Sequence, residues 1–539
     1  MLEGLDRGRE LYRQRAWADA YELLSPLEPE LGGDDLELLA IAAYMLGRDD
    51  TSIRVFERAH HVHVEAKQPT RAGRCAFWVA LQVLLRGEPA RANGWLTRGQ
   101  RVIADLDCAA RGYLQIPMAE QRLRAGDPTR ARAMAAAAAE IGARLHDPDL
   151  AVCARHVEAR SLLALEDLDG GLGLLDEVMI AVIGGELSPI MTGLVYCSVI
   201  DACQDRYEVA RAREWTIALA AWCAKQPQLV SFTSTCLAHR AEILHLDGAW
   251  TEALDEARGA CARFASGLDR RPPAGAYYQQ GEIYRLRGEL DAAEHAYRTA
   301  SEWGFDPQPG MALLRLAQGQ SEVARAMLDR VLTATAAPLR RMRLLPARVE
   351  IALAHGALDE ARAAADELAA GVGACRNEVL AATAAQLHGA VALAEGRPRD
   401  ALAVLRDALA TWQRLAAPYA AARTRELLAS ACAGVGDREG QRLDLEGARA
   451  TYRRLGARPD VARVDTALAE VRRSASPVLS ARELQVLGMV TSGKTNRRIA
   501  AELRLSEKTI DRHVSNIFTK LHVSSRAAAA AYAVRHKLV

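Results

Sequence analysis

Basic and polar side chains recur along the segment 507–521 at positions that would share one face of an α-helix. At about 100° per residue, this face carries Lys508, Arg512, Ser515, Asn516 and Thr519. A guanidinium can donate two hydrogen bonds to the O6 and N7 atoms of guanine, whereas ammonium, hydroxyl and amide groups bind phosphate and sugar oxygens. The pattern indicates recognition of a nucleic acid. The opposite face is apolar and consists of Ile510, Val514, Ile517 and Leu521.

The residues around this segment predict three further short helices. Ser480 and Glu483 have the spacing of a capping box, with Leu479 and Leu484 as a hydrophobic staple, so a first helix is expected over 481–492 before Gly493. A second helix is expected over 496–504, and Ser506 should cap the third, over 507–521. Ser524 or Ser525 should cap an alanine-rich fourth helix over 526–537. Two short helices joined by a tight turn are a helix-turn-helix, whose second helix enters the major groove of DNA.

The segment 479–539 resembles the C-terminal DNA-binding domain of LuxR-type transcription regulators. Two departures from that pattern are visible. Ala481 replaces a proline at the first helical position, and Asp511 stands where many members place a lysine. The resemblance is carried by Leu479, Arg482, Glu483, Gly493, Asn496, Ile499, Ala500, Leu503, Ser506, Thr509, Ile510, His513, Ile517, Lys520, Leu521 and Arg526.

The resemblance and the polar face together assign expected roles to the third helix. Arg512 is the expected base contact, flanked by Lys508 and Ser515. Asp511 either accepts from a cytosine amine or faces solvent, and His513 is expected to pack beside the apolar stripe. Phosphate or sugar contacts are expected from Thr509, Asn516, Thr519 and Lys520.

In LuxR-type domains the fourth helix pairs two copies on a two-fold-related site. The resemblance therefore implies a homodimer, at least on DNA. The small-residue surface that would allow close approach is Ala527, Ala530, Ala531 and Val534.

Charge is distributed unevenly along the chain. The sixty residues from Ser480 carry a net charge of +7, whereas the other 479 carry −6, and four of the six lysines lie in this tail. A basic solvated helix can arise without function, but a basic domain that also carries the motif favours binding to double-stranded DNA.

The sequence GMVTSGKT at 488–495 matches the phosphate-binding pattern of nucleotide-binding loops. That loop requires a buried strand before it, whereas a capped helix is expected here. We therefore expect no nucleotide at this site, and no other cofactor is indicated.

Internal repeats cover the region that precedes the tail. A glycine is followed five residues later by alanine in seven places: Gly87/Ala92, Gly126/Ala131, Gly248/Ala253, Gly288/Ala293, Gly319/Ala324, Gly356/Ala361 and Gly396/Ala401. A glycine that ends one helix and an alanine that allows the next to approach it describe a helical hairpin. The copy at 277–307 resembles a tetratricopeptide repeat through Tyr277, Gly281, Tyr284, Gly288, Ala293, Tyr297, Ala300 and Pro307.

These observations predict an all-α protein. Eleven or twelve hairpins should stack into a right-handed, tetratricopeptide-like α-solenoid over 1–473, followed by a linker at 474–479 and a four-helix domain at 480–539. The groove of such a solenoid is expected to bind an unknown protein, peptide or small-molecule effector. Most of the tryptophans are expected to lie in the helix-packing core.

Several other classes of protein are disfavoured. The charged start MLEGLDRGRE lacks the apolar run of a secretory signal, and no stretch of eighteen apolar residues occurs, so a membrane span is not expected. The ten cysteines form no C-x-x-C pair, which favours a reducing cytoplasm. No enzyme motif is convincing. His60, His61 and His63 have no second cluster of ligands, so no metal site is expected.

We therefore expect a cytoplasmic, non-enzymatic transcription regulator that binds specific DNA sequences and carries a helical-repeat sensor. It resembles the C-terminal part of large ATP-binding LuxR-family regulators without their nucleotide-hydrolysing module. The alternative is a helical-repeat interaction scaffold whose tail no longer binds DNA, and the carboxylate of Asp511 is the residue that favours it.

Overall fold

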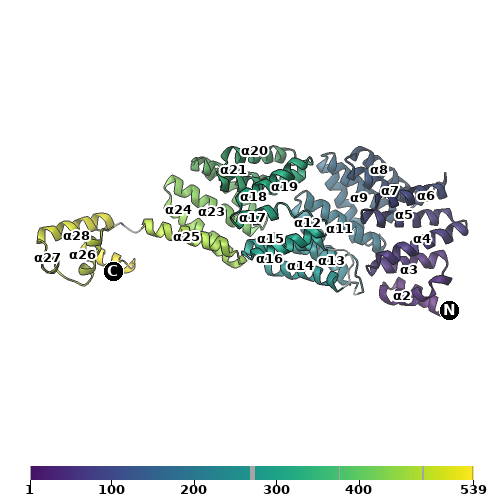
Figure 1. The fold of residues 1–539 in the computed structure, drawn as a ribbon, viewed down its shortest axis with the longest axis horizontal. Helices are drawn as coiled ribbons and strands as arrows, with labels where there is room; N and C mark the ends of the chain where they lie inside the picture. Colours follow the sequence, from purple (N-terminus) through teal and green to yellow (C-terminus); the bar gives the residue numbers. More distant parts are fainter. Residues whose placement is uncertain are drawn as a thin grey trace. The chain divides into compact units, whose positions relative to one another are not determined.

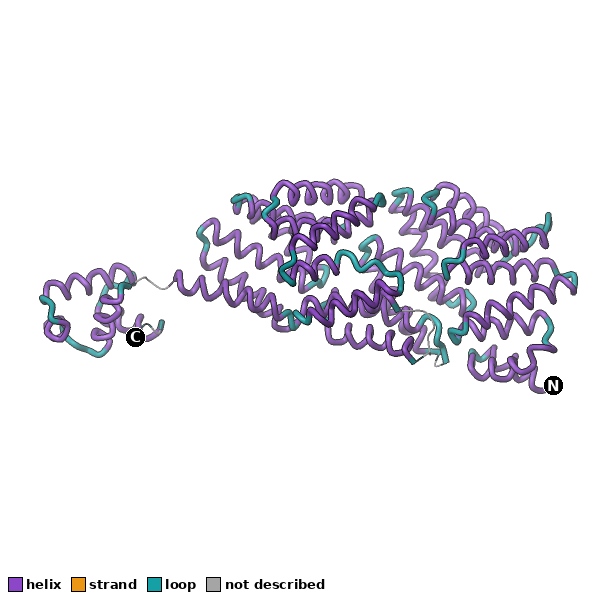
Figure 2. The backbone as a smooth tube through the Cα atoms, viewed as in Figure 1, coloured by secondary structure: helices purple, strands orange, loops and turns teal. Residues whose placement is uncertain are grey.

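The protein is helical throughout the part of the chain that the structure describes (Figures 1 and 2). The computed structural model describes residues 2–226, 228–266, 273–375, 377–475, 479–536 and 538. These residues form twenty-nine α-helices and one 3-10 helix, with no strand among them. The prediction of an all-α protein is confirmed. No described helix is both long enough and apolar enough to cross a membrane.

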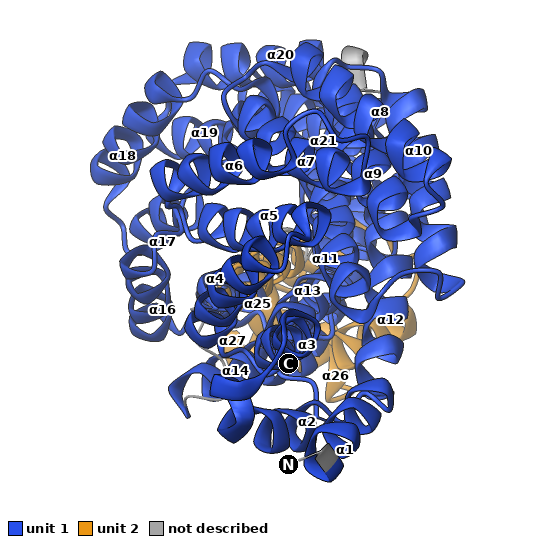
Figure 3. Ribbon diagram, turned by 90° about the vertical axis from the view of Figure 1, so that its right-hand side faces the viewer, with its two compact units in different colours: residues 1–461 blue, residues 462–539 orange. Residues whose placement is uncertain are grey.

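Contacts between residues divide the chain into two compact units, Met1–Val461 and Ala462–Val539, coloured separately in Figure 3. The division falls inside α25 (Arg458–Ala475). Most of the predicted linker, at 476–478, lies outside the described residues, so the expected domain limits of 473, 474–479 and 480 stay predictions.

The first unit is built from consecutive helical hairpins. Each odd-numbered helix packs against the even-numbered helix that follows it, which gives twelve hairpins over α1–α24 in the described residues. The first helices are α1 (Leu2–Arg13), α2 (Trp17–Leu24), η1 (Ser25–Glu30), α3 (Gly33–Met45), α4 (Asp49–Glu65), α5 (Pro69–Leu85), α6 (Pro89–Ile103), α7 (Ala109–Arg124), α8 (Pro128–Arg144), α9 (Pro148–Ala164), α10 (Leu168–Ile183), α11 (Pro189–Asp205) and α12 (Val209–Ala224).

Successive hairpins also stack on one another, as shown by contacts of α5 with α7, of α13 with α15 and of α21 with α23. The predicted stack of eleven or twelve hairpins is confirmed. The remaining helices are α13 (Thr233–Leu246), α14 (Trp250–Ala265), α15 (Ala274–Arg287), α16 (Leu290–Glu302), α17 (Gly310–Ala317), α18 (Ser321–Ala334), α19 (Pro338–His355), α20 (Leu358–Cys375), α21 (Glu378–Ala394), α22 (Pro398–Arg414), α23 (Pro418–Val435) and α24 (Arg438–Leu455).

The repeat residues occupy the positions that the sequence pattern requires. All seven glycines have φ between +74° and +80°, the left-handed region that ends a helix and that favours glycine. All seven alanines have no exposed surface. The hairpins therefore turn at the glycine, and their helices meet at the alanine.

The same packing buries five of the eight tryptophans: Trp17, Trp78, Trp215, Trp250 and Trp412. Trp303 differs, because 47% of its surface is exposed. The core assignment is therefore confirmed for most tryptophans and wrong for Trp303.

Hairpins that are far apart in the sequence also touch within the first unit, which the repeat pattern does not predict. Gln228 accepts a hydrogen bond from the Ala18 amide at 2.9 Å, across 210 residues. Asn377 donates to the Arg206 and Tyr207 carbonyls at 3.1 Å, and Arg343 donates to the Gln204 carbonyl at 3.0 Å. The solenoid therefore coils tightly enough for non-neighbouring repeats to bond.

The second unit contains four short helices around one apolar core. They are α26 (Ala481–Thr491), α27 (Asn496–Leu503), α28 (Glu507–Leu521) and α29 (Arg526–Arg535). Gly493 has φ +75°, and Ser506 accepts from the Thr509 amide, as predicted. Ser525 caps α29 by accepting from the Ala528 amide at 3.1 Å. The fourth helix ends two residues before the predicted position 537, and Lys537 lies outside the described residues.

The capping box of α26 also holds the end of α28. Ser480 and Glu483 exchange the two predicted hydrogen bonds, and the Lys520 ammonium donates to Oε2 of Glu483 at 2.7 Å. Burial raises the pKa of the Glu483 carboxyl, but hydrogen bonds from Lys520 and Ser480 outweigh burial and hold that pKa below its ordinary value. One buried carboxylate therefore joins the start of the first helix to the end of the third.

Ala361→Leu tests the close approach of helices within a hairpin. Ala361 has no exposed surface, so the larger side chain should destabilise α19 and α20 by about 1 to 3 kcal/mol. Ala363→Leu, at an exposed position of the same helix, is the matched control. Hydrogen exchange of both helices measures the local loss; equal protection in the two variants would contradict the proposed packing.

Glu483→Gln tests the carboxylate that joins α26 to α28. Loss of its charge should destabilise the second unit by about 1 to 2 kcal/mol at neutral pH. Because the folded-state pKa is depressed, this stabilisation is present above the unfolded pKa and is lost as the pH falls through the folded pKa. Thermal unfolding of α26–α29 across pH measures it, with Glu507→Gln, an exposed acidic residue in the first turn of α28, as control.

Candidate nucleic-acid interface

The apolar stripe of α28 forms the centre of the second unit's core. Ile510, Val514, Ile517 and Leu521 are each less than 8% exposed and pack with Val486, Leu487 and Ile499 of the two preceding helices. A helix with one face against its neighbours must present the other face outward. The predicted orientation of α28 is therefore confirmed.

The outward face carries the predicted polar residues. Thr509 is half-buried, whereas the other seven side chains predicted to bind DNA are exposed: Lys508, Asp511, Arg512, Ser515, Asn516, Thr519 and Lys520. Within the described residues no side-chain hydrogen bond or ion pair engages Lys508, Arg512 or Asn516. The guanidinium and ammonium groups at the front of α28 are therefore available to a ligand. His513 is half-buried, in keeping with a packing position.

Asp511 has a partner within the protein, which neither sequence interpretation included. Its Oδ1 accepts a hydrogen bond from Nδ2 of Asn496 at 2.6 Å, and Oδ1 of Asn496 accepts from Arg526 at 2.6 Å. Arg526 also donates to the Lys494 carbonyl. The Asp511 carboxylate therefore helps to fix α28 against α27 and α29, and its exposed position does not leave it simply in solvent.

Two further side chains of the face make contacts within the domain. The Thr519 hydroxyl donates to the Ser515 carbonyl at 3.0 Å, and the Thr509 hydroxyl lies 2.7 Å from the Ser506 hydroxyl. Lys520 is 43% exposed although its ammonium is bonded to Glu483. The Lys520 side chain thus reaches the surface while its ammonium is engaged within the domain.

The alanine-rich helix α29 has one buried side and one exposed side. Ala529 and Ala533 are fully buried in the core. The residues predicted to pair two domains lie on the other side: Ala527, Ala531 and Val534 are exposed, the last by 67%, and Ala530 is half-buried. An exposed apolar surface at the end of a small domain is suited to contact with a second copy.

The nucleotide-binding match does not form a phosphate loop. Gly488 to Thr491 lie within α26, Gly493 ends that helix, and the Lys494 ammonium pairs with Glu502. A helix therefore precedes the loop, as the sequence analysis expected, and no strand occurs in the described part of the chain.

One cluster of potential metal ligands occurs in the first unit among the described residues, at Glu37, His63 and Cys75. Both ring nitrogens of His63 already have partners, Oε1 of Glu37 at 2.9 Å and Oε1 of Gln68 at 2.7 Å. Burial lowers the pKa of His63, but these acceptors outweigh it and raise the pKa overall. An imidazolium that donates from both nitrogens accounts for this histidine without a metal.

Sequence reasoning found the face of α28 but missed the bonds that orient the helix. Arg482 donates to the Leu503 carbonyl at 3.1 Å, and Arg526 reaches Asn496 and Lys494. These residues were visible as positions of the LuxR-type pattern. Their pairing was not, because the partners are 21 to 32 residues apart.

Comparisons with known proteins agree with this geometry for the tail. Residues 477–533 match bacterial regulatory proteins of the luxR family. The chain is 48% identical over 61 residues to the transcriptional regulatory protein LiaR of Bacillus subtilis, and 45% identical over 73 residues to the probable transcriptional regulatory protein NarL of Mycobacterium tuberculosis. These matches cover 11% and 13% of this chain, and 29% and 34% of the relatives, so the chain spans about a third of their length.

Among solved structures, the chain is similar to the APC/C hetero-tetramer Cut9–Hcn1 and to yeast Tom70. Both are 12% identical, with TM-scores of 0.34 and 0.32. The alignments cover 85% and 90% of this chain, and 95% and 98% of the other chains. The four helices, the exposed face of α28 and the match over 477–533 lead to one conclusion: the C-terminal segment is a LuxR-family helix-turn-helix domain.

Proposed function

We propose that this protein is a transcription regulator that binds double-stranded DNA by inserting α28 into the major groove. The observation that carries the proposal is Arg512, an exposed guanidinium with no protein partner among the described residues, opposite the buried stripe of the same helix. LuxR-type domains and the regulatory proteins similar to this chain support the same function.

The proposed mechanism divides the residues of α28 between sequence reading and positioning. Arg512 donates to O6 and N7 of a guanine, with Lys508 and Ser515 beside it. The second carboxylate oxygen of Asp511 can accept from a cytosine amine while the first holds Asn496. Contacts to phosphate or sugar come from Thr509, Asn516, Thr519 and Lys520.

The charge of the domain supplies the part of the affinity that does not depend on sequence. A net charge of +7 on sixty residues attracts the phosphate backbone and releases its counterions, so binding should weaken steeply with salt. A second copy bound through α29 would double the number of contacts on a two-fold-related site.

The solenoid is proposed to be the sensor of this regulator, acting in the cytoplasm on an unknown effector and without catalysis of its own. Hairpin stacks present extended surfaces, and the solenoid and the basic domain belong to different compact units. The alternative, a scaffold without DNA binding, depended on Asp511. The bond from Asn496 gives that carboxylate a structural role within the domain, which supports DNA binding over the scaffold.

Arg512→Ala tests base reading. The full-length variant should lose about 1 to 3 kcal/mol of affinity for a duplex selected from a random library, and its selectivity at one base pair should relax. Asn516→Ala, on the same exposed face, should weaken selected and random duplexes alike. Titrations at several salt concentrations separate these effects. Equal losses on both duplexes for Arg512→Ala would exclude it from base reading, and salt-insensitive binding by the wild type would favour the scaffold.

Val534→Glu tests pairing through α29. A buried carboxylate at the contact of two copies should abolish cooperative binding to a duplex that carries two half-sites, while binding to one half-site is retained. Arg535→Gln changes an adjacent exposed residue and is the control. Unchanged cooperativity in Val534→Glu would show that the copies pair elsewhere.

A further inference from the structure

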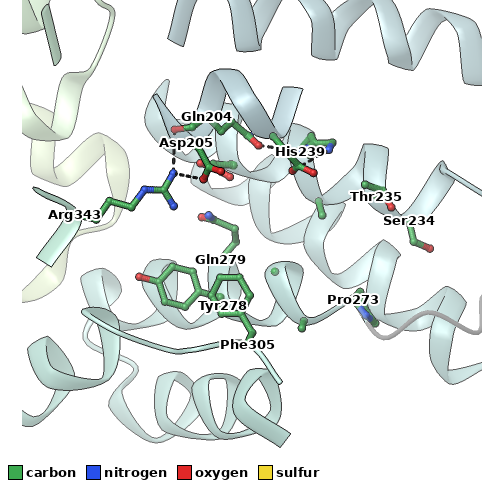
Figure 4. Close-up of a pocket in the computed structure, with 15 residues that line it drawn as sticks. Gln204, Asp205, Ser234, Thr235, His239, Pro273, Tyr278, Gln279, Phe305 and Arg343 are labelled. Carbon is green, nitrogen blue, oxygen red and sulfur yellow. Dashed lines mark hydrogen bonds and ion pairs between the residues drawn. The ribbon is translucent and has the colours of Figure 1, made fainter. Parts of the chain in front are cut away.

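A cavity of about 340 Å³ lies inside the first unit, where helices from four different hairpins meet. Its walls come from α11, α13, α15 and α19, and the loop that carries Phe305 closes one side (Figure 4). In the view of Figure 4, Asp205, Gln204 and His239 lie on one side, and Tyr278 and Phe305 lie opposite. The cavity therefore has a polar wall and an aromatic wall.

The polar wall contains a buried acceptor that has no donor. His239 is 6% exposed, and its Nδ1 lies 3.0 Å from Oε1 of Gln204, which can only accept. Nδ1 therefore carries the proton, and burial lowers the pKa of His239 to about 4, so the ring is neutral near pH 7. Nε2 is then an acceptor, and it is buried without a hydrogen bond among the described residues.

Other polar atoms at this cavity are also unsatisfied. The hydroxyl of Ser234, which is 5% exposed, and Nε2 of Gln204 are both buried without a hydrogen-bonding partner in the described chain. Buried polar atoms are nearly always paired in folded proteins. Three unpaired polar atoms around one cavity indicate that a bound molecule supplies their hydrogen-bond partners.

Three carboxyl groups line this wall, those of Asp201, Asp205 and Glu242, and the side chains of the two aspartates are largely exposed. Oδ1 of Asp201 lies 3.9 Å from Nε2 of His239, and Glu242 follows His239 by nearly one helical turn without a hydrogen bond or ion pair among the described residues. Burial raises the pKa of Glu242 to about 7; attraction to Arg343 lowers this pKa, and repulsion from Asp201 and Asp205 adds to the rise. Asp205 differs from them because Arg343 donates to it at 3.1 Å. Within the described residues Asp201 and Glu242 therefore form no ion pair with an arginine or lysine, although Arg343 is near enough to lower the pKa of both.

The aromatic wall can bind the apolar part of an organic cation. The rings of Tyr278 and Phe305 lie 5.1 Å apart between centroids. Aromatic faces attract cations and bury apolar groups. The Arg343 guanidinium is bonded through Nη2 to the Gln204 carbonyl and to Asp205, so part of its charge is already paired at the polar wall.

We propose that this cavity binds a small organic amine as its ammonium ion. A nitrogen placed about 2.8 Å from both Nε2 of His239 and Oδ1 of Asp201 can donate to each, since ammonium has three donors. Glu242 adds negative charge when it gives up its proton, which a bound ammonium favours, and the carbon body of the amine packs on Tyr278 and Phe305. A metal ion does not suit the site, because the trio Glu37, His63 and Cys75 is the one described group close enough to hold one.

Calorimetric titration of the full-length protein with 2-phenylethylamine tests the proposal. We expect one site, with affinity at least tenfold higher than for N-acetyl-2-phenylethylamine, which has the same ring without the charge. 3-Phenylpropionate, which carries a negative charge instead, should not bind. Comparable affinity for the amine and its amide, or no amine binding at millimolar concentration, would overturn the proposal.

Two variants locate the binding. Glu242→Gln removes a carboxyl group that can become negative when the ammonium binds, and His239→Phe keeps a ring in place but removes the acceptor; each should weaken binding of the amine at least tenfold. Asp255→Asn, on the exposed surface of α14, should bind as the wild type does. The amine should raise the melting temperature of the wild type and not that of Glu242→Gln, and a cooperative unfolding transition of Glu242→Gln without the amine shows that this variant is folded. Unchanged affinity in both cavity variants would overturn the assignment.

Binding of the amine does not depend on the proposed function. Only the idea that the amine is an effector of the regulator rests on the proposed sensor role. Amine binding is measured without DNA, and DNA binding is measured without the amine. Failure of one experiment therefore leaves the other proposal standing.

Discussion

Burial of the apolar stripe of α28 is the constraint on which the proposed DNA interface depends. Once Ile510, Val514 and Ile517 are packed against α26 and α27, the position of Arg512 on the opposite side of the helix follows from helical geometry alone. At about 25 cal/mol per Å² of buried apolar surface, any rotation of α28 that hid Arg512 would expose several such side chains at a cost of several kcal/mol. The apolar burial that stabilises the domain therefore also directs the proposed recognition face of α28 outward.

Packing fixes the rotation of α28, and hydrogen bonds fix its tilt. Glu483 holds its C-terminal end through Lys520, and Asp511 links its N-terminal half to Asn496 and through it to Arg526. Asp511 is exposed on the face that is proposed to meet DNA, where a free acidic group would be unfavourable, whereas Glu483 is buried. Each is paired with a donor from the protein. The domain therefore contains these two bonded acidic residues and still carries a net positive charge.

The repeats and the helix cap could be predicted from the sequence, whereas the hydrogen bonds between distant residues could not. The seven glycine and alanine pairs and the cap at Ser480 depend on neighbours within about a dozen residues, so the sequence displays them directly. The bond from Asn496 to Asp511 spans 15 residues, and that from His239 to Gln204 spans 35. The bond from Arg343 to Gln204 spans 139. Such contacts depend on how the hairpins coil, which the repeat pattern leaves open.

That coiling gives the first unit a property that a simple row of hairpins lacks. In such a row each repeat contacts only its neighbours, and a ligand on one repeat affects little else. Here Arg343 of α19 bonds to α11, and both helices line the cavity beside α13 and α15. A molecule bound there would contact hairpins that are distant in the sequence and would favour whichever coiling of the solenoid places those walls at bonding distance. A ligand shifts a conformational equilibrium only by the difference in its affinity for the two states. A cavity whose walls come from non-neighbouring repeats is suited to such a difference, because any loosening of the coil would move those walls apart.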